Sequence, residues 1–294
     1  MHGGLREPVN RTVPAEQAEE FSRRGAGYPA VPIDDADLSS LYRFGDGALS
    51  PLTGPMTREV WERCLEESVI ECQGRRYAWT IPISFPVSKA DATGLKLDQK
   101  VRLVNAGGDL VGVLHVTDIF PYDKSKYLNA VYQTPRTDHP GGRMVLGDPR
   151  ELLLGGEVEV LSPPVHPEYG RFVLRPSETR RLFANKGWTR IVAFQTRNPL
   201  HRAHEYALVY GLETLVRECD TAGAVLNPLI GETKADDVDA ATRMRTYQAL
   251  LESKALGQGD SDESLWAAKP YSLHDRVLLL GLESRCSTRA RRRP

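Results

Sequence analysis

The 294-residue sequence has few cysteines and lacks any apolar run long enough to cross a membrane. Its four cysteines, at positions 64, 72, 219 and 286, show no CxxC spacing, which argues against a disulfide framework or a zinc site and favours inert thiols in a reducing compartment. An apolar run such as RVLLLGL is far shorter than the roughly 20 residues of a membrane span. The first residues, MHGGLREPVNRTVP, lack the basic-then-apolar pattern of a signal peptide. We therefore expect a cytoplasmic protein.

An excess of charge of one sign is also absent, because the formal net charge is −1. The sequence therefore offers no general electrostatic attraction to nucleic acid or to an anionic membrane. A GxxxxGK[ST] motif is lacking too, which argues against P-loop chemistry. The charge is unevenly distributed, since residues 283–294, ESRCSTRARRRP, contain five arginines and one glutamate.

Residues 1 to about 172 are rich in short apolar runs bounded by turn residues, namely YAWTIPISFPV, KVRLVN, LVGVLHVTDIF and EVEVL. Each run is typical of a strand, and residues 105–109 predict a hairpin connection between two of them. Only TREVWERCLEE clearly predicts a helix. The sequence thus indicates a β-rich domain over residues 1–172, with few helices.

Strands and helices alternate from residue 173 to about residue 282. This alternation favours right-handed βαβ units and a parallel sheet. The expected order is a capped helix from Ser177 to Lys186, a strand at 190–194, a helix from His201 to Arg217, a strand at 224–230, a helix at 238–253 and a strand at 276–281.

The junction between strand 190–194 and the following helix collects polar side chains: Gln195, Thr196, Arg197, Asn198, His201 and His204. Ligands bind beyond the carboxyl ends of open parallel sheets, and a helix N-terminus suits an anion. The guanidinium of Arg197 matches the oxygens of phosphate or sulfate, and the two histidines, spaced i and i+3, can reach one ligand. The junction contains no evident nucleophile paired with a base. It therefore predicts catalysis of phosphoryl-type transfer by positioning and charge stabilisation.

Simpler interpretations of these residues remain open. Two histidines at this spacing can bind a metal, although HRAHE lacks the HExxH pattern of zinc peptidases, and they can also be merely solvated. Arg197 alone would more often form a surface ion pair, and Lys234 is as readily solvated as functional. The whole string at a strand-to-helix junction is what favours a ligand site.

The string QTRNPLHRAHE resembles the signature of the ATP sulfurylase (sulfate adenylyltransferase) family, whose HxxH is a variant of the nucleotidyltransferase HxGH motif. Other family-like segments follow in family order: HGG at His2, LSPLTGPM, HPGG at His139, RPSETRRLFANKGW and LIGETKADDVDAATRMRTY. The resemblance covers residues 1 to about 282. It implies an α/β fold with a β-rich domain, in which a PUA-like N-terminal β-domain precedes an incomplete Rossmann-like nucleotidyltransferase domain.

The resemblance also implies a reaction, in which MgATP and sulfate give adenosine 5′-phosphosulfate and pyrophosphate. It assigns sulfate to Gln195 and Arg197, and catalysis to Thr196, Arg197 and Asn198 around the α-phosphate. His201 and His204 would engage the ATP phosphates and stabilise the departing pyrophosphate, so that all six junction residues contact ATP.

The resemblance implies magnesium only as MgATP, without a metal bound by the protein itself. Its expected partners are ATP and sulfate, without nucleic acid or membrane, and a homo-oligomer is an open alternative. The PUA-like resemblance does not carry RNA binding with it, because the first half has no basic-aromatic patch.

The sequence departs from the family after RVLLLGL, where the family continues with a segment similar to DIKMxYAGPxEA and later with a GR(D/K)HA motif. One nucleotide sequence, written with chosen synonymous codons, encodes Glu283 to Ala290 in one frame and VKMLYAGP in another. This favours a frameshift near Glu283 over a genuine basic tail at 283–294. We therefore expect an incomplete catalytic domain, low solubility and little or no turnover. Another small-molecule nucleotidyltransferase, or a non-catalytic chain that binds sulfate or a partner, stays open as an alternative function.

Overall fold

The computed structural model describes residues 2–134, 140–219, 221–230, 238–257 and 273–283. The chain divides between Pro164 and Val165 into two compact units. We call residues 1–164 unit 1 and residues 165–294 unit 2, and each is considered by itself.

Unit 1 is built on a five-stranded sheet of order β1-β5-β6-β7-β4. β1 is parallel to β5, and the other neighbours are antiparallel. Asn105 closes the expected hairpin between β5 and β6, because its Oδ1 accepts hydrogen bonds from the backbone N–H groups of Gly107 and Asp109, each at 2.9 Å. The strands are β1 (Ala30–Pro32), β4 (Phe85–Val87), β5 (Gln99–Val104), β6 (Leu110–Pro121) and β7 (Leu152–Val160), with a separate hairpin of β2 (Val69–Cys72) and β3 (Arg75–Ala78).

The expectation of one strand over YAWTIPISFPV is wrong. β3 ends at Ala78 and β4 begins at Phe85, so the middle of this segment belongs to neither strand. Pro82 lies in that middle part and has no backbone N–H to donate to a neighbouring strand.

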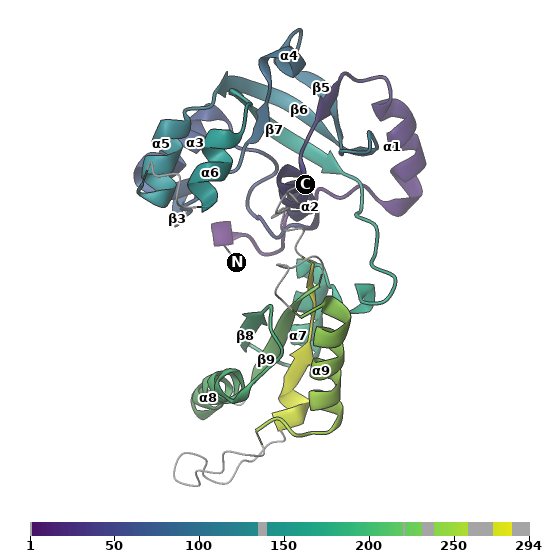
Figure 1. Cartoon of the computed structure of the whole chain (residues 1–294), viewed down its shortest axis with the longest axis vertical. Coiled ribbons are helices and arrows are strands. Elements are labelled where there is room, and N and C mark those ends of the chain that lie inside the picture. The colour runs from purple at the N-terminus through teal and green to yellow at the C-terminus, as the bar shows by residue number, and fades with distance from the viewer. Residues whose placement is uncertain (1, 135–139, 220, 231–237, 258–272, 284–294) are drawn as a thin grey trace, which may run out of the picture. The chain divides into compact units, whose positions relative to one another are not determined.

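The expectation of few helices in the first half is also wrong. Unit 1 contains α1 (Ala18–Gly25), α2 (Asp35–Asp46), α3 (Arg58–Glu67), α4 (Lys89–Ala92), α5 (Lys124–Tyr127) and α6 (Pro140–Gly147), of which only α3 was predicted. α4 and α5 have four residues each, and Phe21 is the one large side chain that α1 buries, so their apolar periodicity is too weak to recognise. Figure 1 shows α3, α5 and α6 gathered at one end of the sheet and α1 at the other.

Helix α2 covers the core of unit 1. It begins after Asp34, whose side chain accepts a hydrogen bond from the backbone N–H of Asp37 at 2.8 Å, as an N-cap residue does. Leu38, Leu41 and Phe44 lie on one face of the helix and are buried in a cluster with residues of β5, β6 and β7. Burial of this apolar stripe stabilises the helix against the sheet.

A loop crosses strand β7 at two successive glycines. The backbone N–H of Gly156 donates to the carbonyl of Pro55 at 2.9 Å, so the loop pairs with the strand through main-chain groups. A Cβ atom at Gly54 would lie 2.3 Å from the carbonyl oxygen of Gly156, and one at Gly155 would lie 2.6 Å from that of Met56. Only glycine allows the two backbones to approach so closely.

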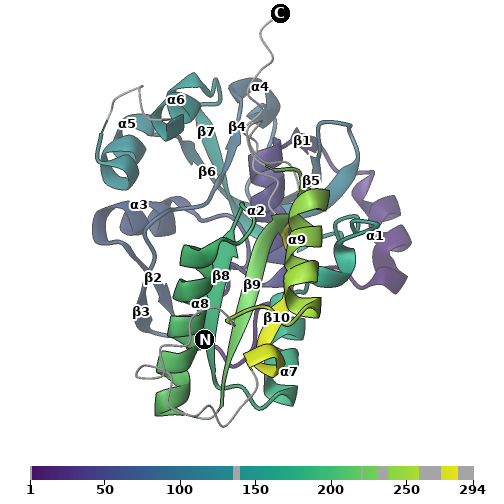
Figure 2. The ribbon, with the colours of Figure 1, turned by 60° about the horizontal axis from the view of Figure 1, so that its bottom comes forward.

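Unit 2 contains the parallel sheet that the sequence predicts. β9 (Ala222–Ile230) pairs in parallel with β8 (Arg190–Thr196) on one side and with β10 (Val277–Leu279) and β11 (Leu282–Glu283) on the other. The strand expected at 276–281 is therefore shorter, and a second short strand follows it. Figure 2 shows β8, β9 and β10 side by side, with the helices of unit 2 along them.

The three helices predicted in the second half are present as α7 (Pro176–Asn185), α8 (Arg202–Glu218) and α9 (Ala240–Glu252). The expected start of the first helix at Ser177 is wrong by one residue. Pro176 occupies the first helical position, where its fixed φ is favourable, and the carboxylate of Glu178 accepts from the backbone N–H of Arg175 at 2.8 Å. None of the helices that the structure describes is long and apolar enough to cross a membrane.

Short single-turn helices complete the described elements of both units. They comprise His2–Gly4, Ala15–Gln17, Leu128–Tyr132, Gly170–Phe172 and Leu273–Arg276.

The core of unit 2 fixes α8 and α9 against the central strand. Leu208 and Leu212 of α8, Ala224 and Leu226 of β9 and Tyr247 of α9 are buried in one cluster. The carboxyl end of β8 and the beginning of α8 are thereby held on a packed scaffold.

Three cysteines among the described residues, Cys64, Cys72 and Cys219, are free thiols. Burial raises the pKa of Cys64 to about 11, so this thiol stays neutral and unreactive in the core. Cys286 lies outside the described residues.

Candidate functional site

The predicted site residues lie on one strand-to-helix connection in unit 2. Gln195 and Thr196 end β8, and His201 is the N-cap residue of α8. Gln195, Arg197, Asn198 and His201 are exposed, whereas Thr196 and His204 are half-buried. A ligand from solvent can therefore reach these side chains. Lys234 and the GETKADD segment, and His139 of HPGG, lie outside the described residues.

The turn after β8 is closed by its own side chains and by helix α9. The backbone N–H of Asn198 donates to the hydroxyl oxygen of Thr196 at 3.1 Å. The carbonyl oxygen of Asn198 accepts from the hydroxyl of Tyr247 at 2.8 Å, and that of Arg197 accepts from Nη1 of Arg243 at 2.5 Å. Two consecutive carbonyl groups of the turn are thus bound by side chains of α9.

Arg243 is fully buried although it carries a permanent charge. Its Nη1 also donates to the carbonyl of Val238 at 2.9 Å, and its Nε donates to that of Leu229 at 3.1 Å. One guanidinium therefore joins the turn after β8, the end of β9 and the approach to α9. Arg243 and Tyr247 are not among the predicted site residues, although their spacing, with Leu250 seven residues after Arg243, places this arginine on the apolar face of the helix.

The two histidines are in direct contact. The ring centroids of His201 and His204 lie 3.7 Å apart in a stacked arrangement, and His204 lies 5.4 Å from the ring of Phe194. Within the described residues, Nδ1 of His204 is buried without a hydrogen-bond partner. The stack holds both imidazoles close enough to act on one ligand.

The N-terminus of α8 is suited to negative charge. No side chain among the described residues caps it, so its first backbone N–H groups are available to an anion. The acidic residue of the first turn, Glu205, is buried and already engaged, since its carboxylate accepts from Arg202 at 3.0 Å and from the backbone N–H of Gly257 at 2.5 Å. Glu205 thereby anchors the start of α8.

The side chains of the junction are groups that can donate hydrogen bonds: two amides, a hydroxyl, a guanidinium and two imidazoles. Such a set matches the oxygens of an anion better than it matches a metal cation. In the part of the chain that the structure describes, no group of three or more His, Cys, Asp or Glu side chains is arranged to hold a metal ion.

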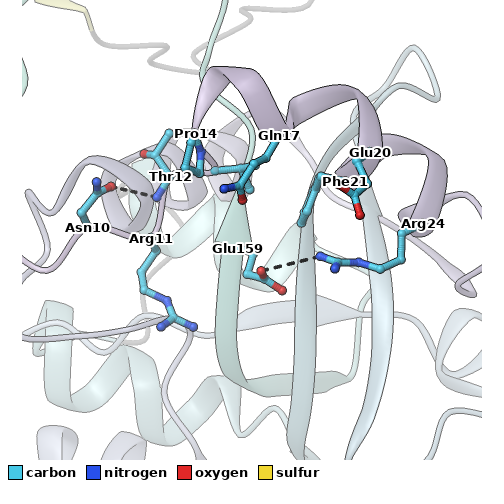
Figure 3. Close-up of a pocket in the computed structure, with 10 residues that line it drawn as sticks. Asn10, Arg11, Thr12, Pro14, Gln17, Glu20, Phe21, Arg24 and Glu159 are labelled. Carbon is cyan, nitrogen blue, oxygen red and sulfur yellow. Dashed lines mark hydrogen bonds and ion pairs between the residues drawn. The ribbon is translucent and has the colours of Figure 1, made fainter.

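Unit 1 contains a separate polar pocket of about 320 Å³, lined by the chain around Thr12, by α1 and by β7 (Figure 3). Both of its arginines have a carboxylate beside them: Arg24 lies 3.9 Å from Glu159 of the same lining, and Arg11 lies 3.1 Å from Glu157 on β7. These ion pairs engage both arginines of the pocket within unit 1, and the pocket includes none of the predicted site residues.

Comparison with protein families matches both halves of the chain. The PUA-like domain family matches residues 1–163, and the ATP-sulfurylase family matches residues 170–267. The predicted fold class, a PUA-like domain followed by a nucleotidyltransferase-type α/β domain, is confirmed. The predicted domain limits, 1–172 and 173–282, stay a prediction.

A solved structure, described as a hexameric APS kinase from Thiobacillus denitrificans, has a similar fold. The TM-score is 0.66 at 23% sequence identity, and the match covers 96% of this chain and 46% of that chain. At this identity the likeness shows the fold alone.

Curated relatives are similar over most of this chain. A sulfate adenylyltransferase of Pyropia yezoensis is 46% identical over 288 residues, which are 97% of this chain and 67% of that protein. A sulfate adenylyltransferase of Synechococcus sp. (strain JA-3-3Ab) is 39% identical over 251 residues, which are 85% of this chain and 61% of that protein. The matched part is thus about two thirds of the length of these relatives. With the signature at the β8–α8 junction and both domain families matched in order, the chain belongs to the sulfate adenylyltransferase (ATP-sulfurylase) family.

Proposed function

We propose that this chain binds MgATP and sulfate and serves the sulfate adenylyltransferase reaction. In that reaction a sulfate oxygen forms a bond to the α-phosphorus of ATP. The bond between this phosphorus and the oxygen that bridges to the β-phosphate breaks, and pyrophosphate leaves with the electron pair. The observation that supports this function best is the donor-rich β8–α8 junction, whose backbone is fixed by buried side chains of α9.

The roles proposed for the junction residues are those that the family signature implies, and the chemistry of each side chain supports them. Arg197 and Gln195 bind sulfate, because a guanidinium and an amide can donate to its oxygens without reacting with it. Thr196 and Asn198 lie next to them on the turn and contact the α-phosphate. His201 and His204, stacked at the start of α8, bind the phosphates that depart.

Sulfate is a weak nucleophile, so the rate must come from alignment of the two anions and from stabilisation of charge that develops on the leaving group. A fixed turn and a helix N-terminus supply donors that need no reorganisation during the reaction. Each such donor is typically responsible for a factor of about 10²–10³ in rate.

Magnesium enters this proposal as part of the MgATP substrate. A homo-oligomer is part of the proposal as an assembly state, supported by the hexameric state named for the solved structure of similar fold. We also propose a cytoplasmic site of action, since ATP is the substrate and the described thiols are free.

We propose further that the 294-residue chain turns over slowly when it is alone. Among the described strands, β8 pairs only with β9, so one edge of this signature-bearing strand has no strand beside it. The non-catalytic alternative, a chain that binds sulfate or a partner, rests on the same observation. The frameshift near Glu283 stays a prediction, because residues 284–294 lie outside the described residues.

The test is sulfate-dependent pyrophosphate release from MgATP by the purified chain, together with calorimetry of MgATP and of sulfate. We expect binding of both ligands and turnover below about 1 s⁻¹, lower than is common for enzymes. Pyrophosphate release that does not depend on sulfate would favour another nucleotidyltransferase. Binding of both ligands without any pyrophosphate release would favour the non-catalytic alternative. Failure to bind either ligand would refute the proposed function.

A further inference from the structure

Two consecutive carbonyl oxygens of the signature turn point to buried groups. The carbonyl of Arg197 accepts from the fully buried guanidinium of Arg243, and that of Asn198 accepts from the buried hydroxyl of Tyr247. The side chains of Arg197 and Asn198 themselves are exposed. The turn thus has an inner side of carbonyl oxygens and an outer side of hydrogen-bond donors.

Which side of the turn a carbonyl faces matters for an anion. A carbonyl oxygen carries partial negative charge and can only accept hydrogen bonds, so beside sulfate or phosphate it repels the ligand. The peptide groups of a turn can rotate when no partner holds them, and rotation of either group here would bring an oxygen to the outer side.

We propose that Arg243 and Tyr247, which we call the α9 clamp, are positioning residues that keep these two carbonyl oxygens away from the bound anion. This inference rests on the proposed function, since it takes the outer side of the turn as the anion site. The clamp reaches the turn across 46 and 49 residues of sequence, so helix α9 orients a site whose signature residues it does not contain.

The chemistry of Arg243 supports more than a packing role. A buried guanidinium is costly to desolvate, and a well-packed apolar residue often stabilises a core as well or better. Three carbonyl oxygens accept from Arg243, and among the described residues no carboxylate pairs with it. Its charge therefore adds positive potential beneath the turn, where an anion is stabilised by it.

The hydroxyl of Tyr247 can be removed with less disturbance of the core than the guanidinium of Arg243. Burial raises the pKa of Tyr247, so the hydroxyl stays protonated and donates to the Asn198 carbonyl over the whole neutral range. Its ring belongs to the apolar core of unit 2. Replacement by phenylalanine removes this hydrogen bond, leaves the Asn198 carbonyl only the longer contact from the Thr196 hydroxyl at 3.3 Å, and keeps most of that packing.

The experiment compares Tyr247→Phe, Arg243→Lys and Arg243→Met in the full chain. Matched controls are Tyr210→Phe, on the exposed face of α8, and Arg245→Met, an exposed arginine two residues along α9. One readout is amide hydrogen exchange of residues 195–204 without ligand. The other is the affinity for sulfate and for MgATP, measured by calorimetry well below the melting temperature of each variant.

We expect Tyr247→Phe to weaken anion binding by about three- to tenfold and to speed exchange in the turn by a similar factor, as the loss of one hydrogen bond implies. Arg243→Met should weaken binding more, and Arg243→Lys should restore part of the loss because it keeps the charge. Both controls should match the unmodified chain.

The two proposals fail in different ways. A Tyr247→Phe variant that is less stable, yet exchanges and binds anions like Tyr210→Phe, would show that the clamp is only structural and overturn the inference. If the unmodified chain binds neither MgATP nor sulfate, the proposed function is wrong. Amide hydrogen exchange in the turn then tests whether Arg243 and Tyr247 hold the turn in place. Faster exchange confined to residues 195–201 would then support it, and unchanged exchange would overturn it.

Discussion

Arg197 presents a planar and permanently charged group at the exposed end of β8. Under the proposed function it forms paired hydrogen bonds to sulfate, which are typically worth about a few kcal/mol when the anion is desolvated. Arg197→Ala should therefore abolish measurable sulfate binding in calorimetry, and Arg197→Lys should retain only part of it, because an ammonium cannot form the planar pair. Arg217→Ala, at the far end of α8, is the control. Sulfate affinity near that of the unmodified chain in Arg197→Ala would disprove the assigned role.

A second residue with a predictable effect is Asp37 in unit 1. It lies in a cluster where Arg150 binds three carboxylates, at 2.7 Å from Asp37, 2.8 Å from Asp34 and 2.7 Å from Asp148. Burial, reinforced by the charge of Asp34, raises the pKa of Asp37 from its ordinary value of 3.8 to about 7. The pKa of Asp148 is instead lowered, because its hydrogen bonds to Arg150 outweigh the effect of its burial.

This raised pKa fixes the sign of a pH effect. The folded chain binds the Asp37 proton more tightly than the unfolded chain does, so its contribution to stability is full below about pH 4 and is lost as the pH rises through about 7. Between pH 5 and pH 8, the unfolding free energy from urea titration should fall by up to about 1–3 kcal/mol more in the unmodified chain than in Asp37→Asn. Asp35→Asn, exposed on the same helix, is the control. Equal pH dependence of the unmodified chain and Asp37→Asn would contradict this.

At the residue scale, the sequence indicates the site only where its signal is local. Gln195 to His204 are contiguous, so a strand pattern, a turn and a helix start suffice to bring them together. Arg243 and Tyr247 reach the turn across 46 and 49 residues, and their contribution depends on how α9 packs against β9. The spacing of Arg243, Tyr247 and Leu250 marks one apolar face of α9, but an arginine in a helical segment ordinarily predicts solvent exposure, so the complete burial of Arg243 goes beyond what this spacing predicts.

At the level of elements, central strand β9 packs against the indole of Trp188 at its first residues. A Cβ atom at Gly223 would lie 2.2 Å from atoms of this indole. Gly223→Ala should therefore force the ring or the strand to move and lower the unfolding free energy by about 1–3 kcal/mol, which urea titration followed by tryptophan fluorescence measures. Gly147→Ala, whose Cβ would have open space, is the control and should be nearly neutral. A neutral Gly223→Ala variant would show that Trp188 can leave this position freely.

Elements with a long and regular apolar pattern are the ones that the sequence predicts well. β8, β9 and the three helices of unit 2 agree with expectation to within a few residues, because each alternates with clear turn residues. The structure of the segment around Pro82 and the four-residue helices α4 and α5 were not predicted correctly. A single proline interrupts the strand pattern, and a single helical turn is too short to show an apolar period. α2 was missed although its apolar stripe is clear in the structure.

For the whole molecule, two units with their own apolar cores imply a localised response to ligands. The clusters around Leu41 and around Leu208 lie in units 1 and 2 respectively, and all predicted site residues are in unit 2. At saturating MgATP and sulfate we expect slower hydrogen exchange in the described strands of unit 2, with about 2–3 kcal/mol of added stability at a hundredfold excess over Kd. Exchange in β5 and β6 is the internal control. Equal protection of both units would contradict a site confined to unit 2.

The contact of the loop at Gly54 with Gly155 and Gly156 has a consequence for how the family can vary. Gly54 on the loop and Gly155 on β7 share one steric constraint, so a side chain gained at either position requires the loop to be rebuilt, whereas a side chain at Gly156 would meet His115 of β6 instead. Natural variation at positions 54 and 155 should therefore be concerted: lineages keep both glycines, or lose both together with a change in loop length. Relatives in which residue 54 varies while the β7 glycine and the loop length stay the same would show that this close approach of loop and strand is dispensable.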